Sequence, residues 1–253
     1  MKLRLDKLLT DRGLAPSRER AQAMVLAGRV LINEQKVTKA GTQVEESAVI
    51  RLLGEDMRYV SRGGLKLERA LQHWGIKCGG KTGLDIGAST GGFTDCFLQH
   101  GAARVIAVDT GYGQIDARLR NDPRLRLLER TNARYLEPES VPEDIDIIAM
   151  DVSFISATLV LPAVLCVVQE VKTPHRRDLI VLVKPQFEVG RERVGKGGIV
   201  RNEAAQQDAV EKVRAAVKQL GGTEIEVIDS PILGTEGNKE FLLHAVFGVS
   251  SEE

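Results

Sequence analysis

Two ionisable residues stand immediately after apolar runs of strand length. Asp151 follows the run that ends at Met150, and Lys184 follows the run that ends at Val183. Such runs are typical of buried parallel strands, and open α/β sheets build their sites just past the carboxyl ends of these strands. We therefore predict that Asp151 and Lys184 lie in one site.

Two more charged residues could join them. Lys66 lies on an amphipathic segment before the first predicted strand, and Glu240 begins the last one. Two lysines and two carboxylates can position a hydroxyl group and remove its proton. Lys184 is the candidate base, because desolvation and the charge of Lys66 favour the neutral amine. Asp151 and Glu240 would orient the lysines, and Lys66 would bind the hydroxyl oxygen or a phosphate.

A glycine-rich segment follows the first strand expected in the sheet, at 82–86. Its G-x-x-x-G-G pattern, from Gly87 to Gly92, lets a ligand approach the backbone closely at the start of a helix. Asp109 ends the next strand about twenty residues later, where a carboxylate can accept hydrogen bonds from both hydroxyls of a ribose. These features indicate a nucleoside cofactor.

The loop alone leaves a nicotinamide dinucleotide and S-adenosylmethionine as competing cofactors. The two lysines favour S-adenosylmethionine, because hydride transfer does not need them. Asn132 is a candidate contact for an adenine ring, and a turn capped by its side chain is nearly as good an interpretation. The predicted cofactor-binding residues are Asp85, Gly87, Ala88, Ser89, Thr90, Gly91, Gly92, Asp109, Asn132 and Asp151.

A second glycine pattern, at 75–82, satisfies the phosphate-loop signature G-x-x-x-x-G-K-T. A phosphate loop must leave a strand and open a helix, so that helix amides hold the phosphates. Here the expected helix comes first and the strand second. We therefore interpret this segment as a connection and not as a nucleotide site.

The elements that position these residues alternate along the chain. Strands are expected at 82–86, 104–108, 145–150 and 179–183, and helices at 65–74, 94–100, 157–168 and 203–220. Two further strands, at 224–228 and 241–247, are expected to form a hairpin. The pattern predicts a doubly wound, Rossmann-like α/β sheet.

The charge of the chain is unevenly distributed. Lys and Arg together number 35, as do Asp and Glu, but residues 1–40 hold nine basic and four acidic residues, which leaves +5 there and −5 in the remainder. Helical spacing of Leu5, Leu8 and Leu9, an N-cap at Ser17, and short strands at 30–32 and 48–53 predict a small α+β unit. We expect three parts: an RNA-binding domain at 1–58, a linker at 59–64 and a catalytic domain at 65–248.

Clustered cations can replace the counterions of RNA phosphates, and exposed aromatic rings can stack on bases. Phe154 and Phe187 flank the predicted site and could stack on a base turned out of an RNA helix, and core packing is an equal alternative for both. The candidate RNA-binding residues are Arg4, Arg18, Arg20, Lys36, Phe154, Arg191 and Lys196.

Motifs along nearly the whole chain, taken together, resemble one family. Residues 1–55 resemble the S4-type RNA-binding fold, and the Lys-Asp-Lys-Glu set resembles that of FtsJ-type ribose 2′-O-methyltransferases. The combination is similar to the TlyA, or hemolysin A-like, family of rRNA methyltransferases. This resemblance implies S-adenosylmethionine as cofactor and cytidine 2′-hydroxyls of ribosomal RNA, free or in ribosomal subunits, as substrate. The motifs are Ser61-Arg62-Gly63-Gly64-Leu65-Lys66-Leu67, Gly87-Ala88-Ser89-Thr90-Gly91-Gly92-Phe93-Thr94-Asp95, Asp151-Val152-Ser153-Phe154-Ile155-Ser156, Val183-Lys184-Pro185-Gln186-Phe187 and Gly195-Lys196-Gly197-Gly198.

Other features of the sequence bear on where the protein acts. Three widely spaced cysteines, no signal-like start and no apolar run of membrane length favour a reducing cytoplasm without membrane association. The four histidines show no ligand spacing, so no metal site is expected. Two other functions remain as alternatives: an RNA-binding assembly factor without turnover, and a membrane-active hemolysin.

Overall fold

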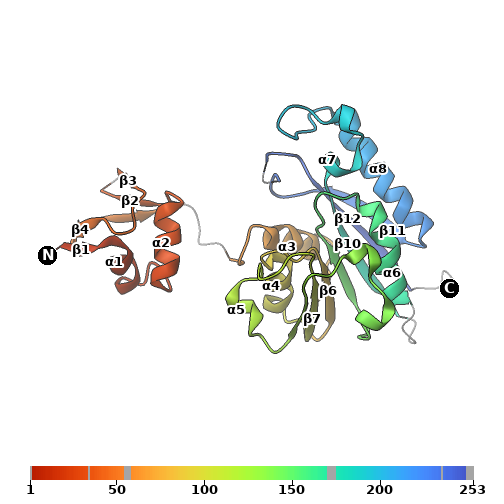
Figure 1. Cartoon of the computed structure of the whole chain (residues 1–253), viewed down its shortest axis with the longest axis horizontal. Helices are drawn as coiled ribbons and strands as arrows, with labels where there is room; N and C mark the ends of the chain where they lie inside the picture. The colour runs from red at the N-terminus through yellow and green to blue at the C-terminus, as the bar shows by residue number, and fades with distance from the viewer. Residues whose placement is uncertain (1, 34, 54–57, 170–174, 235, 249–253) are drawn as a thin grey trace. The chain divides into compact units, whose positions relative to one another are not determined.

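The structure is a computed structural model that describes residues 2–33, 35–53, 58–169, 175–234 and 236–248. The chain forms two compact units, residues 1–58 and residues 59–253 (Figure 1). Each unit has its own apolar core. None of the helices within the described ranges combines the length and the apolar composition that crossing a bilayer requires.

The first unit packs two helices against short strands. Ser17 caps the second helix, where its hydroxyl accepts a hydrogen bond from the backbone N–H of Arg20 at 3.2 Å. The core consists of side chains from both helices, among them Leu5, Leu9 and Met24. The strands form an antiparallel pair, β1-β4, and a three-stranded sheet in the order β3-β2-β5. The elements are β1 (Lys2–Arg4), α1 (Leu5–Asp11), α2 (Arg18–Leu26), β2 (Val30–Ile32), β3 (Gln35–Val37), β4 (Gln43–Glu45) and β5 (Ile50–Leu52).

The second unit is built on a seven-stranded sheet in the order β11-β12-β10-β9-β6-β7-β8. Five strands, β6 to β10, run parallel, and β12 runs antiparallel to both of its neighbours. This arrangement confirms the doubly wound sheet and the closing hairpin. The elements are α3 (Gly63–His73), β6 (Thr82–Ile86), α4 (Gly92–Gln99), β7 (Arg104–Val108), α5 (Ala117–Arg120), β8 (Leu125–Leu128), η1 (Ala133–Tyr135), η2 (Pro138–Ser140), β9 (Ile147–Met150), η3 (Ala157–Leu159), α6 (Leu161–Gln169), β10 (Arg177–Val183), α7 (Pro185–Glu188), η4 (Arg191–Arg193), α8 (Glu203–Gln219), β11 (Thr223–Asp229) and β12 (Phe241–Phe247).

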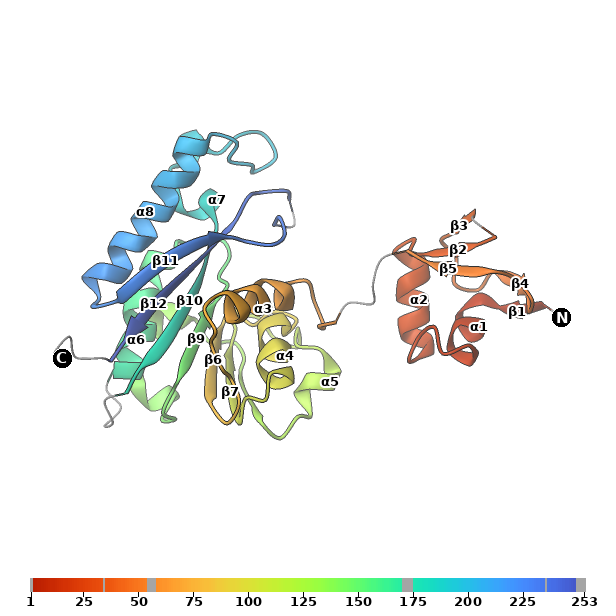
Figure 2. The same cartoon turned by 180° about the vertical axis from the view of Figure 1, so that it is seen from behind.

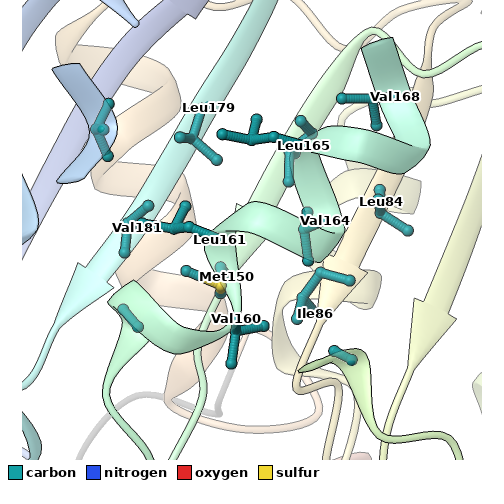
Figure 3. Packing of buried hydrophobic residues seen from close by; sticks show 14 of the residues in the cluster. Leu84, Ile86, Met150, Val160, Leu161, Val164, Leu165, Val168, Leu179 and Val181 are labelled. Carbon is teal, nitrogen blue, oxygen red and sulfur yellow. The ribbon is translucent and has the colours of Figure 1, made fainter. Parts of the chain in front are cut away.

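Helices cover both faces of this sheet (Figures 1 and 2). Alternate residues of one strand enter different cores, as the two-residue repeat of a strand requires. In β10, Leu179 and Val181 pack with α6 and α8, whereas Ile180 and Leu182 pack with α3 and α4. Figure 3 shows the α6 side, where Leu161 and the neighbouring side chains of that helix lie over the strands. Burial on both faces explains why the strands are continuous apolar runs.

The sheet topology brings the candidate residues to one edge. The chain leaves β6 on one side toward β7 and later returns to β9 on the other, so β6 and β9 flank a topological switch point. Ile86 and Met150 pair at the ends of these strands, which puts Gly87 beside Asp151. Since β12 is antiparallel to β10, the start of β12 lies beside the end of β10.

Several predicted boundaries differ from the structure. The strand β8 was not among the predicted strands, because its residues are only partly buried at the sheet edge and lack a continuous apolar run. The helix expected at 157–168 is divided into η3 and α6, with Pro162 in the first turn of α6, where the missing N–H has no cost. The connection at 75–82 between α3 and β6 is confirmed, which rules out the phosphate loop.

The linker expected at 59–64 is wrong, because these residues are part of the second unit. Tyr59 is 2% exposed and packs among α3 and α4, and Gly63 already begins α3. The backbone N–H of Val60 also donates to the Asp95 carboxylate at 2.7 Å. These residues therefore belong to the second unit, and part of the polar stretch before them, at 54–57, lies outside the described residues.

Candidate active site

The glycine loop passes directly beneath the end of β9. Gly87 has φ +88°, and a Cβ there would stand 2.4 Å from the backbone oxygen of Asp151. Only glycine combines this backbone conformation with so close an approach. The loop is also tied to the next strand: the backbone N–H of Ser89 donates to Asp109 Oδ2 at 2.7 Å, and that of Gly111 donates to Oδ1 at 2.6 Å. Asp109 is thereby held in a fixed orientation at the end of β7.

A cavity of about 320 Å³ opens beside this carboxylate. Asp109 and Asn132 both line it, together with apolar side chains such as Val108 and Ile155. The side chain of Asn132 accepts from the backbone N–H of Arg134 at 3.0 Å, so it caps η1 as well as lining the cavity. The lining residues are Gly87, Ser89, Val108, Asp109, Thr110, Gln114, Thr131, Asn132, Ala133, Asp151, Val152, Ser153, Phe154, Ile155 and Val160.

Asp85 occupies a different place from the other predicted cofactor residues. It is fully buried in β6 below the loop and does not line either cavity of the site. Its Oδ2 accepts from the Thr94 hydroxyl at 2.6 Å. Burial raises the pKa of Asp85 to about 7, and the charges of Asp151 and Asp109 add to the rise while the Thr94 bond opposes it. Asp85 therefore joins β6 to α4, the helix that follows the loop.

The raised pKa of Asp85 predicts a pH-dependent stability. Between about pH 4 and pH 7 the folded chain keeps a proton that the unfolded chain releases, so the free energy of unfolding falls as pH rises through this range. We expect Asp85→Asn to remove this slope and to stabilise the chain at pH 8 by at most about 4 kcal/mol. Thermal unfolding of both proteins at pH 5 and pH 8 tests this, and an unchanged slope in the variant would contradict it.

The four predicted charges line a second cavity, of about 280 Å³, on the other side of the loop. They form two ion pairs. Lys66 Nζ lies 2.5 Å from Glu240 Oε2, and Lys184 Nζ lies 2.5 Å from Asp151 Oδ1. The side chains are 3–20% exposed, and Lys184 also donates to Ser153 Oγ at 2.7 Å. Each lysine is thus paired and held at the cavity wall.

Four separate elements supply these charges. Asp151 directly follows β9, and Lys184 directly follows the adjacent parallel strand β10. Glu240 precedes β12, whose first residue pairs with Val183 at the end of β10. Lys66 comes from the first turn of α3. The sheet and its covering helix therefore assemble one constellation from residues far apart in the sequence.

A third cavity, of about 530 Å³, is lined by Lys184 and Glu240. Phe154 and Phe187 both line it, with ring centroids 5.3 Å apart and ring planes inclined by 51°. Phe154 is 92% exposed and has φ +64°, a conformation that costs energy for a residue with a side chain. A solvent-exposed ring of this kind is not part of a core, so core packing does not account for Phe154.

Some residues of the site were not among the predicted ones. Ser153 lines all three cavities and accepts a hydrogen bond from Lys184. Its place two residues after Asp151 was a signal that could have identified it. Ser61, Arg62 and Gly63 line the cavity of the four charges from the start of α3. They belong to a motif of the family, but their polar segment was expected to be a linker and they were therefore not predicted as site residues.

The predicted cations of the first unit are more organised than their sequence suggests. Arg4 donates to both oxygens of Asp6, at 3.1 and 2.9 Å, and Arg18 donates to the same carboxylate at 3.3 Å. Asp6 is fully buried, and the Arg4 bonds hold the pKa of Asp6 well below its usual range. The two guanidinium groups stay about half exposed, so a carboxylate fixes both at the surface.

The other predicted RNA-binding cations lie in two places. Lys36 is exposed on β3, and Arg20 is partly exposed on α2. Arg191 begins η4 and Lys196 follows it, and both are exposed on the second unit. The stretch 191–196 lies close to the cavity of the two aromatic rings, which Val194 lines.

The first two cavities fit an elongated molecule with a nucleoside at one end. They share Gly87, Ser89, Asp151 and Ser153, so they meet above the glycine loop. Asp109 lines the cavity of about 320 Å³, and Asp151 lines both cavities. Two carboxylates and a close backbone approach suit a ribose and a positive charge next to it.

Comparison with known proteins also indicates a methyltransferase. Residues 59–247 match the family model described as FtsJ-like methyltransferase, and residues 3–50 match the S4 domain. The chain is 43% identical over 242 residues to the 16S/23S rRNA (cytidine-2'-O)-methyltransferase TlyA of Mycobacterium tuberculosis, with 95% of this chain and 88% of that protein covered. It is 39% identical to Hemolysin A of Brachyspira hyodysenteriae, with 96% and 100% covered.

A solved structure from Streptococcus thermophilus, whose name also includes the word hemolysin, extends the likeness to three dimensions. It is 42% identical, covers 98% of this chain and 90% of its own, and has a TM-score of 0.74. The resemblance expected from the motifs is confirmed. With its sheet, its glycine loop and a family match over 189 of 253 residues, the chain belongs to the FtsJ-like methyltransferase family.

Proposed function

We propose that this chain uses S-adenosylmethionine to methylate ribose 2′-hydroxyls of ribosomal RNA, with cytidine as the preferred nucleoside. The observation that carries the proposal is that two lysines, each paired with a carboxylate, line a cavity that adjoins another cavity suited to a nucleoside. The relative from Mycobacterium tuberculosis bears the name of this activity and is similar along nearly the whole chain. S-adenosylmethionine supplies an already activated methyl group.

The chain would then provide alignment and a proton acceptor. Lys184 Nζ, when neutral, accepts the proton of the 2′-hydroxyl as the oxygen–methyl bond forms. Asp151 pairs with the lysine and also lines the cofactor cavity, so this carboxylate lies between Lys184 and a cation bound there. Lys66, fixed by Glu240, would bind the hydroxyl oxygen or the neighbouring phosphate.

The acceptor nucleotide would enter past the two aromatic rings. A ribose hydroxyl within a folded RNA helix is hard to reach in line, so the nucleotide must turn outward. Phe154 presents an exposed ring next to Lys184 and is suited to stack on its base. The cations at Arg191 and Lys196 would contact the backbone, and the first unit would supply salt-dependent attachment through Arg4, Arg18, Arg20 and Lys36.

Stacking by Phe154 predicts a specific kinetic effect. We expect Phe154→Ala to raise the KM for RNA about tenfold, because stacking a base on an aromatic ring contributes ~1–3 kcal/mol. Phe154→Tyr keeps a ring of the same size and serves as the control, with a KM near that of the wild type. Steady-state methyl transfer at varied RNA concentration measures both. Equal KM values for the alanine and tyrosine variants would contradict a stacking role.

Radiolabelled methyl transfer to ribosomal subunits tests the function itself. We expect label in the RNA, at positions that resist alkaline cleavage because their 2′-oxygens are methylated. Binding of RNA without label would instead favour an assembly factor without turnover. Ribosomal RNA as substrate and the two buried cysteines, Cys78 and Cys96, are the grounds for our proposal that the protein acts in the cytoplasm.

A further inference from the structure

A buried carboxylate joins the two loops that carry the reactive residues. Glu188 ends α7 with a side chain only 2% exposed. Its Oε1 accepts from the backbone N–H of Ala157 at 2.7 Å, and its Oε2 accepts from the Ser156 hydroxyl at 2.5 Å. Glu188 therefore links the loop after β10 to the loop after β9.

A cation from α8 completes this group. Lys212 Nζ lies 3.2 Å from Glu188 Oε2 and donates to the backbone oxygen of Glu188 at 2.9 Å. Both views show α7 beside α8 (Figures 1 and 2). Both oxygens of the carboxylate accept hydrogen bonds, and Lys212 pairs with its charge. A buried charge requires partners of this kind.

The same two loops are also joined at the reactive edge. Lys184, four residues before Glu188, donates to Ser153 at 2.7 Å, and Ser153 lies three residues before Ser156. Phe154 lies between these two junctions in its left-handed conformation. A residue in such a conformation persists only where its surroundings hold it. Glu188 supplies the junction on the side away from the charges.

We propose that Glu188 is a positioning residue for the acceptor side of the site, which fixes Phe154 and Lys184 relative to each other. This inference rests on the proposed function. The cofactor side does not need Glu188, because the backbone N–H of Asp151 is already bound to Ile86 in the sheet at 2.9 Å. Loss of Glu188 therefore weakens RNA binding and lowers the reaction rate, and leaves cofactor binding unchanged.

The test compares Glu188→Gln with the wild type. The amide has one oxygen, so it can accept from only one of the two donors and turns an N–H₂ group toward the other. We expect kcat to fall at least about tenfold and the KM for RNA to rise, because small misplacement of reacting groups has large effects on rate. The Kd of S-adenosylmethionine, from calorimetric titration, should stay within about twofold.

Asp178→Asn is the matched control for a general loss of stability. Asp178, too, is a buried carboxylate, and it is bound to His244 at 2.9 Å, but it lies near the start of β10, at the end of the strand away from Lys184. We expect it to lower Tm without lowering kcat at a temperature where both variants are folded. If Glu188→Gln shows no greater loss of kcat than Asp178→Asn, or weakens cofactor binding in parallel, the positioning role is wrong.

Two further measurements keep the result unambiguous. An inactive wild type would overturn the proposed function, whereas an active wild type with an equally active Glu188→Gln would overturn only the role of Glu188. If Glu188→Gln does not fold, Ser156→Ala removes the hydroxyl that donates to Glu188, together with the contacts of this hydroxyl with Thr158 and Lys212. The backbone N–H of Ala157 and the Lys212 amine stay on the carboxylate. We then expect a smaller loss of kcat in the same direction, and unchanged kcat in this variant would contradict the proposal.

Discussion

Lys184→Met should reduce methyl transfer by at least about a thousandfold, within the range that a positioned proton acceptor contributes. The side chain of Lys184 is 11% exposed, and Asp151 and Ser153 hold its amine at the cavity wall. Methionine keeps the length and removes the amine. Single-turnover transfer to ribosomal subunits measures the effect, and Lys218→Met, on the exposed side of α8, is the control that should keep full activity.

An arginine at the same position separates the role of a base from that of a charge. Lys184→Arg keeps the positive charge and can still pair with Asp151, but its guanidinium stays protonated. We expect it to be nearly as inactive as Lys184→Met. Substantial activity in the arginine variant would show that charge alone suffices and that Lys184 is not the base.

Breaking the pair of Lys66 and Glu240 should destabilise the second unit strongly. The side chains are 10% and 3% exposed, so removal of one partner leaves a charge in a poorly solvated place. We expect Glu240→Gln to cost about 3 kcal/mol and to lower Tm by roughly 10 °C, with loss of methyl transfer. Thermal unfolding followed by circular dichroism gives the stability, and the transfer assay gives the activity.

The double variant decides whether the two residues act as a pair. Lys66→Met combined with Glu240→Gln leaves no unpaired charge, so its stability should exceed the sum expected from the single variants. Activity should remain lost, because the hydroxyl or phosphate contact of Lys66 is absent. Additive losses of stability would contradict the pairing as the source of the effect.

The parts of the site that follow strand ends could be predicted from the sequence. Asp151 and Lys184 follow continuous apolar runs, and burial on both faces of a parallel sheet produces such runs. Glu240 could be placed for the same reason, since β12 is equally buried. Asn132 was predicted as a nucleoside contact or a cap, and its side chain caps η1 while it also lines the cavity.

Other features depend on contacts between distant residues that leave no local pattern. Tyr59 lies in a polar stretch and becomes buried only because α3 and α4 meet around it. Asp6 reads as one acidic residue of a helix, yet it binds Arg4 and Arg18 and organises both. Asp85 was grouped with the cofactor residues because of its motif, whereas its place within the sheet is set by the direction of the side chain in β6.

The bond between Lys66 and Glu240 joins residues 174 positions apart. Bringing such distant residues together costs chain entropy that only the completed sheet repays, so this contact should form late in folding. Catalytic competence would then arise in the last phase of refolding, after the helices have formed. The time course of recovered methyl transfer during refolding thus reports when β12 docks onto the sheet. Folding intermediates that are rich in helix but lack this strand should have no activity.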